Sequence, residues 1–186
     1  MATAHLPEPA PAHLRPSRLS HLVLKTPRFE EMTAWYKTVL SAKPMFENDV
    51  VCFLTYDEEH HRVMIGRDPN ARPRDPKAAG VVHFAFAVDR LEDLVNAYLR
   101  LKKEGILPHL CVNHGFTTSL YYLDPDGNEC ELAVDNYKTR EEMDAWFATG
   151  AFDENFFGFQ FDPESMVERF QAGIPEDQIL QRDLYQ

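Results

Sequence analysis

Hydrophobic and polar positions alternate around His83, and a few residues later the spacing changes to that of a helix. Bulky apolar side chains occupy every second position of the first segment: Val82, Phe84, Phe86 and Val88. The positions between them are small or polar: His83, Ala85 and Ala87. Alternate side chains of a strand point to opposite faces, so the bulky face can pack on helices while the alanine face leaves room for a ligand. Apolar positions from Leu91 to Leu99 then recur at helical spacing and predict an amphipathic helix.

The same pattern occurs earlier in the chain, at an offset of 62 residues. Without a gap, HFAFAVDRLEDLVNAYLRLK from His83 aligns with HLVLKTPRFEEMTAWYKTVL from His21. Four pairs in this alignment are identical: His21/His83, Arg28/Arg90, Glu30/Glu92 and Tyr36/Tyr98. Short strand candidates follow each copy, at 43–47, 50–56 and 61–66 after the first and at 107–112, 117–123 and 129–134 after the second. We therefore predict a βαβββ unit that occurs twice.

The last two strand candidates are separated by the sequence DPDGN at 124–128, which predicts a turn. In the strand after this turn, alternation puts Glu129, Glu131 and Ala133 on one face. A glutamate of this strand is therefore expected to point into the same concavity as His83.

The segment after the repeat predicts helices. Thr139 and Glu142 have the spacing of a capping box, and the first helix is expected to end at Gly150. Asp162 and Pro163 predict the cap and first position of a second helix. Residues 139–186 contain 11 acidic and 3 basic residues, which is typical of a solvated face. We divide the chain into a flexible arm, 1–18, a domain of two repeats, 19–135, and an acidic helical extension, 136–186.

Composition and charge exclude several classes of function. The net charge of −11 and the absence of clustered Lys and Arg argue against a nucleic-acid partner. The longest apolar segment, around 81–88, is too short to span a bilayer, so no membrane association is expected. The three cysteines lie in apolar segments and form no metal-type pair, and the first 18 residues hold no apolar stretch of signal-peptide length. A reduced, cytoplasmic protein is the simpler interpretation.

Two features together resemble a known family. The paired units are similar to the vicinal oxygen chelate superfamily, and VNHGFTTSLYYLDPDGNECE, at 112–131, resembles the signature of its type I extradiol ring-cleavage dioxygenases. The resemblance implies an α+β fold in which paired βαβββ modules form a metal-binding cup. The helices after 136 resemble the C-terminal extension of single-module extradiol enzymes.

The resemblance also implies a metal centre held by His21, His83 and Glu131, with Glu131 chosen over Glu129 by the spacing of the signature. Two imidazoles and one carboxylate leave open coordination positions, as in non-haem iron(II) oxygenases. The expected cofactor is Fe(II), and Mn(II) accepts the same ligands. The end of the first repeat, near Gly66, offers no fourth ligand opposite Glu131.

Three further residues complete the implied site. His61 is expected to act as the acid and base, His114 to donate a hydrogen bond to oxygen, and Tyr121 to orient the substrate. Alternation is expected to send His60 away from His61 and Tyr122 away from Tyr121. The implied reaction opens the ring of a catechol or aryl-catechol beside its diol, using O₂.

Two alternatives share the fold. A glyoxalase-like metal-dependent isomerase or lyase is disfavoured by the missing fourth ligand and by the set of His61, His114 and Tyr121. A metal-free antibiotic-binding protein would not need the two His and one Glu. A homo-oligomer is expected, with the extension as a cover over the cup or as an interface.

Overall fold

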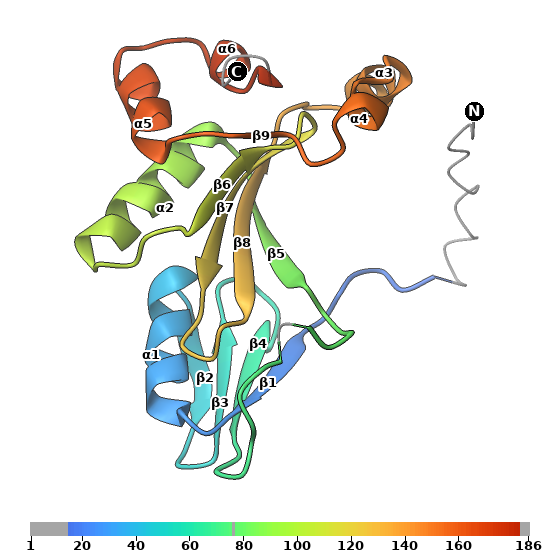
Figure 1. Cartoon of the computed structure of the whole chain (residues 1–186). Helices are drawn as coiled ribbons and strands as arrows, with labels where there is room; N and C mark the ends of the chain where they lie inside the picture. The colour runs from blue at the N-terminus through green and yellow to red at the C-terminus, as the bar shows by residue number, and fades with distance from the viewer. Residues whose placement is uncertain (1–14, 76, 183–186) are drawn as a thin grey trace.

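The computed structural model describes residues 15–75 and 77–182, as two βαβββ modules followed by short helices (Figure 1). Most of the expected arm, 1–18, lies outside the described residues. The predicted α+β class and the repeated unit are confirmed. Within the described part of the chain, no helix combines the length and apolarity that crossing a membrane requires.

The first module, residues 22–67, is a four-stranded sheet with one helix on it. Its elements are β1 (Leu22–Thr26), α1 (Phe29–Val39), β2 (Lys43–Glu47), β3 (Val51–Thr55) and β4 (Val63–Arg67). The strand order is β1-β4-β3-β2, and β1 is parallel to β4. Met32 and Tyr36 of α1 are fully buried against Cys52, Leu54 and Ile65 of the sheet.

The second module, residues 83–135, repeats this order of elements. It contains β5 (His83–Val88), α2 (Leu91–Lys103), β6 (Leu110–Asn113), β7 (Thr117–Leu123) and β8 (Glu129–Asp135). Its sheet has the order β5-β8-β7-β6-β9, in which β9 (Phe159–Gln160) comes from the C-terminal extension, and β5 is parallel to β8. Leu120 and Leu132 pack on the α2 side, so the residues that alternate with them face away from the helix. Cys52, Cys111 and Cys130 are buried and free, as small hydrophobes are expected to be.

The C-terminal extension, described over residues 136–182, contains α3 (Arg140–Ala148), α4 (Ala151–Glu154), β9 (Phe159–Gln160), α5 (Pro163–Gln171) and α6 (Glu176–Ile179). The predicted capping box of Thr139 and Glu142 is present, and the Asp162 side chain caps α5. Strand β9 pairs with β6 and so joins the edge of the second sheet. The extension is therefore part of the second module's structure.

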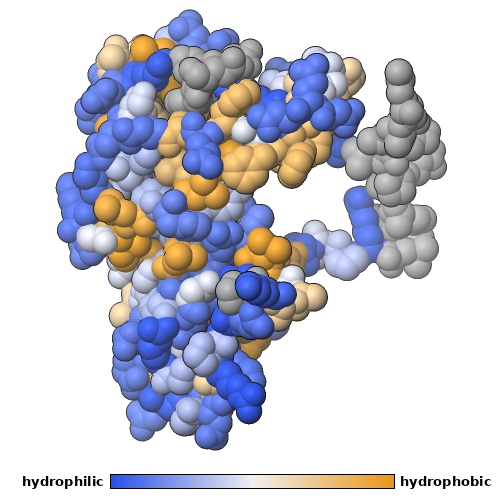
Figure 2. Space-filling view, in the orientation of Figure 1, coloured by the Kyte–Doolittle hydropathy of each residue, from blue (hydrophilic) through white to orange (hydrophobic). Residues whose placement is uncertain are grey.

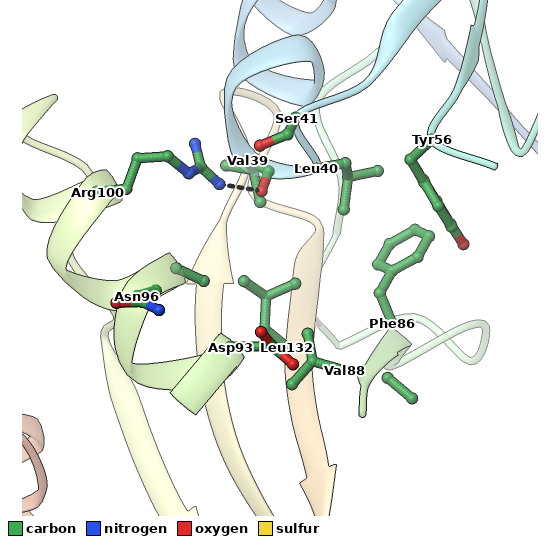
Figure 3. A pocket seen from close by; sticks show the side chains of 12 residues that line it. Val39, Leu40, Ser41, Tyr56, Phe86, Val88, Asp93, Asn96, Arg100 and Leu132 are labelled. Carbon is green, nitrogen blue, oxygen red and sulfur yellow. Dashed lines mark hydrogen bonds between the residues drawn. The ribbon is translucent and has the colours of Figure 1, made fainter. Parts of the chain in front are cut away.

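Buried contacts hold the two modules together in one chain. Tyr36 of α1 donates a hydrogen bond of 2.9 Å to Asp124, in the predicted turn of the second module. Arg100 of α2 donates to the carbonyl of Val39, at the end of α1, at 3.0 Å (Figure 3). Phe84 and Phe86 of β5 pack against the cores of both modules. Consequently α1 and α2 lie on the same side of the two sheets (Figure 1).

A pocket of about 340 Å³ lies at this junction (Figure 3). Tyr56 and Phe86 lie side by side in its wall, with their rings edge to face at 5.8 Å between centroids (Figure 3). Its walls are mostly apolar, with Asp93, Asn96 and Arg100 at one side. The pocket is on the helix side of the sheets and does not contain any of the predicted site residues.

Each of the two sheets has an unpaired edge with exposed apolar residues near it. Strands β1 and β5 each pair with one neighbour only, so each leaves one edge of its sheet without a strand partner in the described chain. Val23 is 58% exposed on β1, and Val82, just before β5, is 67% exposed. Figure 2 shows apolar side chains gathered over the second sheet and the C-terminal extension, with charged side chains around them. These exposed apolar edges are available for contact with another molecule.

Candidate active site

The first group of site residues lies on the helix-free face of the second sheet. Strands β5 and β8 are parallel, and Ala85 lies opposite Glu131. His83 is two residues before Ala85, so its side chain is on the same face of the sheet as that of Glu131. His83 Nε2 is 3.1 Å from Glu131 Oε2. Glu131 is only 6% exposed, and a buried carboxylate requires a partner. The imidazole and the carboxylate are thus aimed at one point, as two ligands of one metal would be.

Tyr121 and His114 continue this row. Tyr121 pairs with Glu131 across β7 and β8, and its ring lies 5.4 Å from that of His83 in a T-shaped arrangement. His114 Nε2 is 2.8 Å from the Tyr121 hydroxyl. Burial, with the negative charge of Glu131, raises the pKa of Tyr121, so the phenol stays protonated at neutral pH. Burial lowers the pKa of His114, which keeps the imidazole neutral there.

The second group lies on the helix-free face of the first sheet. His21 immediately precedes β1 and His61 precedes β4, and the parallel pairing of Leu22 with Val63 brings them together. Their ring centroids are 4.3 Å apart. His61 also stacks on Phe53, at 4.7 Å and an interplanar angle of 18°. Burial, followed by the nearby charges of His21 and of His60, lowers the pKa of His61, so its neutral form can accept a proton.

The expected orientation of His60 is wrong. Its Nδ1 lies 2.6 Å from Nδ1 of His61, so one ring donates a hydrogen bond to the other. Alternation fails because these residues precede β4 and form a bend, in which Thr55 donates to the carbonyl of Glu59 and Arg62 binds the Asp57 carboxylate. Tyr122, by contrast, is fully buried in the core, as expected.

The site residues on the first sheet and those on the second sheet do not form one site within a single chain. Among residues 15–75 and 77–182, no three His, Cys, Asp or Glu side chains lie close enough to hold a metal ion. His83 and Glu131 converge, whereas His21 lies with His60 and His61. One chain therefore presents two of the three predicted ligands at one place and the third at another.

Sequence reasoning missed a role for Glu129 and His109. Glu129 Oε1 is 3.0 Å from His109 Nε2, and its other oxygen is 3.9 Å from His83 Nδ1. At 3.9 Å the carboxylate is beyond hydrogen-bond distance of His83 Nδ1, so Glu129 acts on this ring through its charge, while it contacts His109 directly. The sequence did contain a signal for Glu129, because alternation puts it on the same face as Glu131. It contained none for His109, which lies outside every motif.

The third missed group is a backbone atom. His114 Nδ1 lies 2.6 Å from the carbonyl oxygen of Phe157, in the C-terminal extension. Every residue has a carbonyl, so nothing in the sequence pattern marks this contact.

Comparison with known proteins places these observations in a family. The sequence model of the Glyoxalase/Bleomycin resistance protein/Dioxygenase superfamily matches residues 18–132. The chain is 46% identical over 163 residues to Biphenyl-2,3-diol 1,2-dioxygenase 2 of Rhodococcus globerulus, covering 87% of this chain and 86% of that protein. It is 43% identical to Biphenyl-2,3-diol 1,2-dioxygenase 3 of the same organism, covering 89% of this chain and 88% of that protein.

Solved structures share the fold at lower identity. A glyoxylase/bleomycin resistance protein/dioxygenase domain from Frankia sp. EAN1pec is 19% identical, with a TM-score of 0.56, and the match covers 69% of this chain and 99% of that one. Lactoylglutathione lyase from Agrobacterium tumefaciens is 18% identical, with a TM-score of 0.52, and the match covers 64% of this chain and 94% of that one. At these identities the structures are evidence for the fold alone.

Proposed function

Because this chain belongs to the Glyoxalase/Bleomycin resistance protein/Dioxygenase superfamily and is an extradiol ring-cleavage dioxygenase, we propose that it opens an aryl catechol of the biphenyl-2,3-diol type beside its diol. The observation that carries this proposal is the continuous row of His83, Glu131, Tyr121 and His114 on one sheet face. Such a row combines metal-binding groups with groups that hold or move protons.

Membership of this family implies a catalytic metal, and we propose that it is Fe(II) held by His21, His83 and Glu131, with Mn(II) as the replacement the same ligands accept. The bound metal would supply open positions at which the diol and O₂ meet. His83 and Glu131 fit this role within one chain, whereas His21 does not reach them.

We infer that a second copy of the chain supplies the missing histidine, so that the enzyme is a homo-oligomer. Rotation of the first module onto the open face of the second within one chain would break the buried bond between Tyr36 and Asp124 and expose Phe84 and Phe86. In a two-fold dimer, the edge at β1 of one copy can lie beside the edge at β5 of the other, and the reverse contact forms by symmetry. Each metal site then takes His21 from one copy and His83 and Glu131 from its partner.

The remaining side chains have distinct roles in this proposal. His61, neutral at neutral pH, accepts a proton from a catechol hydroxyl and returns it later. Tyr121, which stays protonated, orients the substrate oxygen by donating to it or to His114. His114 provides a hydrogen-bonding and proton-accepting group next to the Tyr121 hydroxyl.

The function is tested by oxygen uptake. Protein loaded anaerobically with Fe(II) is expected to consume O₂ with biphenyl-2,3-diol and to form a yellow ring-opened product, and to respond more weakly to simple catechols. Glu131→Ala is the matched control, because it removes the ligand and should remove both metal binding and oxygen uptake. No uptake across a panel of simple and aryl-substituted catechols, with iron confirmed bound, would contradict the proposal, as would isomerisation of a hemithioacetal instead.

A further inference from the structure

His114 lies in a loop that is hydrogen-bonded to the C-terminal extension. It directly follows β6, and its neighbour Asn113 is fully buried. Asn113 accepts from the backbone N–H of Gly115 at 2.9 Å and donates to the carbonyl of Leu180, in the extension, at 3.0 Å. Asn113 also pairs with Phe159 of β9. The position of the His114 loop therefore depends on residues 155–180.

The close contact between the two segments requires glycine. Gly158 has a φ of 95°, in the left-handed region, and a Cβ there would lie 2.3 Å from the carbonyl oxygen of Asn113 and 2.7 Å from the Cα of His114. The turn is closed by Asn155, which donates to the carbonyl of Gly158 at 2.9 Å and accepts from its N–H at 3.0 Å. Arg182 donates to the carbonyl of Ala151 at 2.7 Å and so holds the residues that lead into this turn. The carbonyl of Phe157 is thus fixed before any substrate arrives.

This carbonyl decides which nitrogen of His114 carries the proton. A carbonyl oxygen only accepts hydrogen bonds, so Nδ1 of His114, at 2.6 Å, must donate to Phe157. In the neutral imidazole the other nitrogen then has a lone pair, and Nε2 accepts from the Tyr121 hydroxyl at 2.8 Å. A neutral His114 in this state has no free N–H to offer to the substrate.

We propose that the carbonyl of Phe157 is a positioning group for His114, which fixes the Nδ1–H tautomer and makes Nε2 a proton acceptor. This inference rests on the proposed function for its catalytic meaning. It changes the expected role of His114 from donor to acceptor: Nε2 receives a proton through Tyr121 or from the substrate, and the Phe157 carbonyl then stabilises the resulting imidazolium through Nδ1–H. It also assigns the Phe157 carbonyl, together with Asn155 and Gly158 that hold it in place, to the active site.

The tautomer can be measured without turnover. Long-range ¹H–¹⁵N spectra of full-length protein loaded with Zn(II), a diamagnetic ion, report which nitrogen of each histidine is protonated, and His114→Ala identifies the His114 signals. We expect the Nδ1–H form in the wild type. Asn155→Ala opens the turn without touching His114, and we expect a shift toward the Nε2–H form. Phe156→Ala is the matched control, because this side chain is 73% exposed in the same turn.

Kinetics provide the second measurement. Asn155→Ala is expected to lower kcat at least about tenfold, within the range that general acid–base groups contribute, with KM for the catechol and metal content nearly unchanged. Gly158→Ala should behave alike, and Phe156→Ala should match the wild type. An Nε2–H tautomer in the wild type overturns the inference even if every variant fails to fold, and so does an unchanged kcat in a folded Asn155→Ala protein. If the wild type consumes no O₂, the proposed function fails while the spectrum still decides the tautomer.

Discussion

At the scale of single residues, burial decides the protonation of Tyr121 and His114 on the helix-free face of the second sheet. It raises the pKa of Tyr121 and lowers that of His114, so the shared proton stays on the phenol at neutral pH. Both shifts have the same cause, because burial disfavours the charged form of each group. The two side chains therefore form a neutral hydrogen-bonded pair next to the Glu131 carboxylate.

Glu129 is expected to act on the metal site through His83. Glu129→Gln removes the negative charge that lies 3.9 Å from His83 Nδ1 and 3.0 Å from His109. We expect metal affinity to fall by up to about 10-fold, the low end of the range for partners of metal ligands, because at 3.9 Å only the charge interaction with His83 is lost. Competition with a coloured chelator measures this, and Glu104→Gln, an exposed carboxylate after α2, is the control. Equal affinities of the two variants would show that Glu129 does not act on His83.

At the scale of elements, the DPDGN turn does more than reverse the chain. Asp124 is 4% exposed and accepts from the backbone N–H groups of Asp126 and Asn128 at 2.9 and 2.8 Å. The same carboxylate accepts from Tyr36 in the first module. A turn that the sequence predicts from local residue types thus also fixes where α1 lies.

The contact between α1 and this turn is expected to stabilise the chain measurably. Tyr36→Phe leaves the buried Asp124 carboxylate without one of its donors, and hydrogen bonds to charged groups contribute about 1.5–3 kcal/mol. We expect the free energy of unfolding, from urea denaturation, to fall by about that amount. Tyr56→Phe, at a residue 46% exposed, should change it by less than about 0.5 kcal/mol. A similar stability for both variants would mean that this hydrogen bond does not hold the modules.

At the scale of the whole molecule, the arrangement of the modules separates the predicted ligands. The same contacts that unite the cores keep His21 away from His83 and Glu131. A shared site therefore makes a specific prediction about mixed dimers. A heterodimer of His21→Ala with Glu131→Ala combines the intact His21 of one chain with the intact His83 and Glu131 of the other.

Such a heterodimer, purified through two different tags, is expected to regain one of its two sites, which corresponds to about half of the wild-type activity and tightly bound metal. Neither variant alone should bind metal tightly. A heterodimer of His83→Ala with Glu131→Ala is the control, because both changes fall in the same half of the site and no intact site can form. Absence of recovery, or a wild type that is monomeric by light scattering, would contradict the shared site without touching the dioxygenase activity itself.

Much of the fold and part of the site followed from local patterns. The two βαβββ units, the capping box at Thr139 and the cap at Asp162 all lie where spacing predicted them. The convergence of His83 and Glu131 also followed, because alternation puts both on one face of adjacent strands. The orientation of His60 did not follow, because a bend replaces the strand on which the prediction relied.

What the sequence by itself determined is therefore local: element boundaries, the face on which each side chain lies, and the family to which the motifs belong. Periodicity and capping act over a few residues, so they can be read along the chain. Only the tertiary structure decided that His21 lies with His61, apart from Glu131, and that the Phe157 carbonyl meets His114. Both depend on packing between segments distant in sequence, which local patterns do not predict. Every residue has a backbone carbonyl, so no residue type marks the contact of Phe157 with His114.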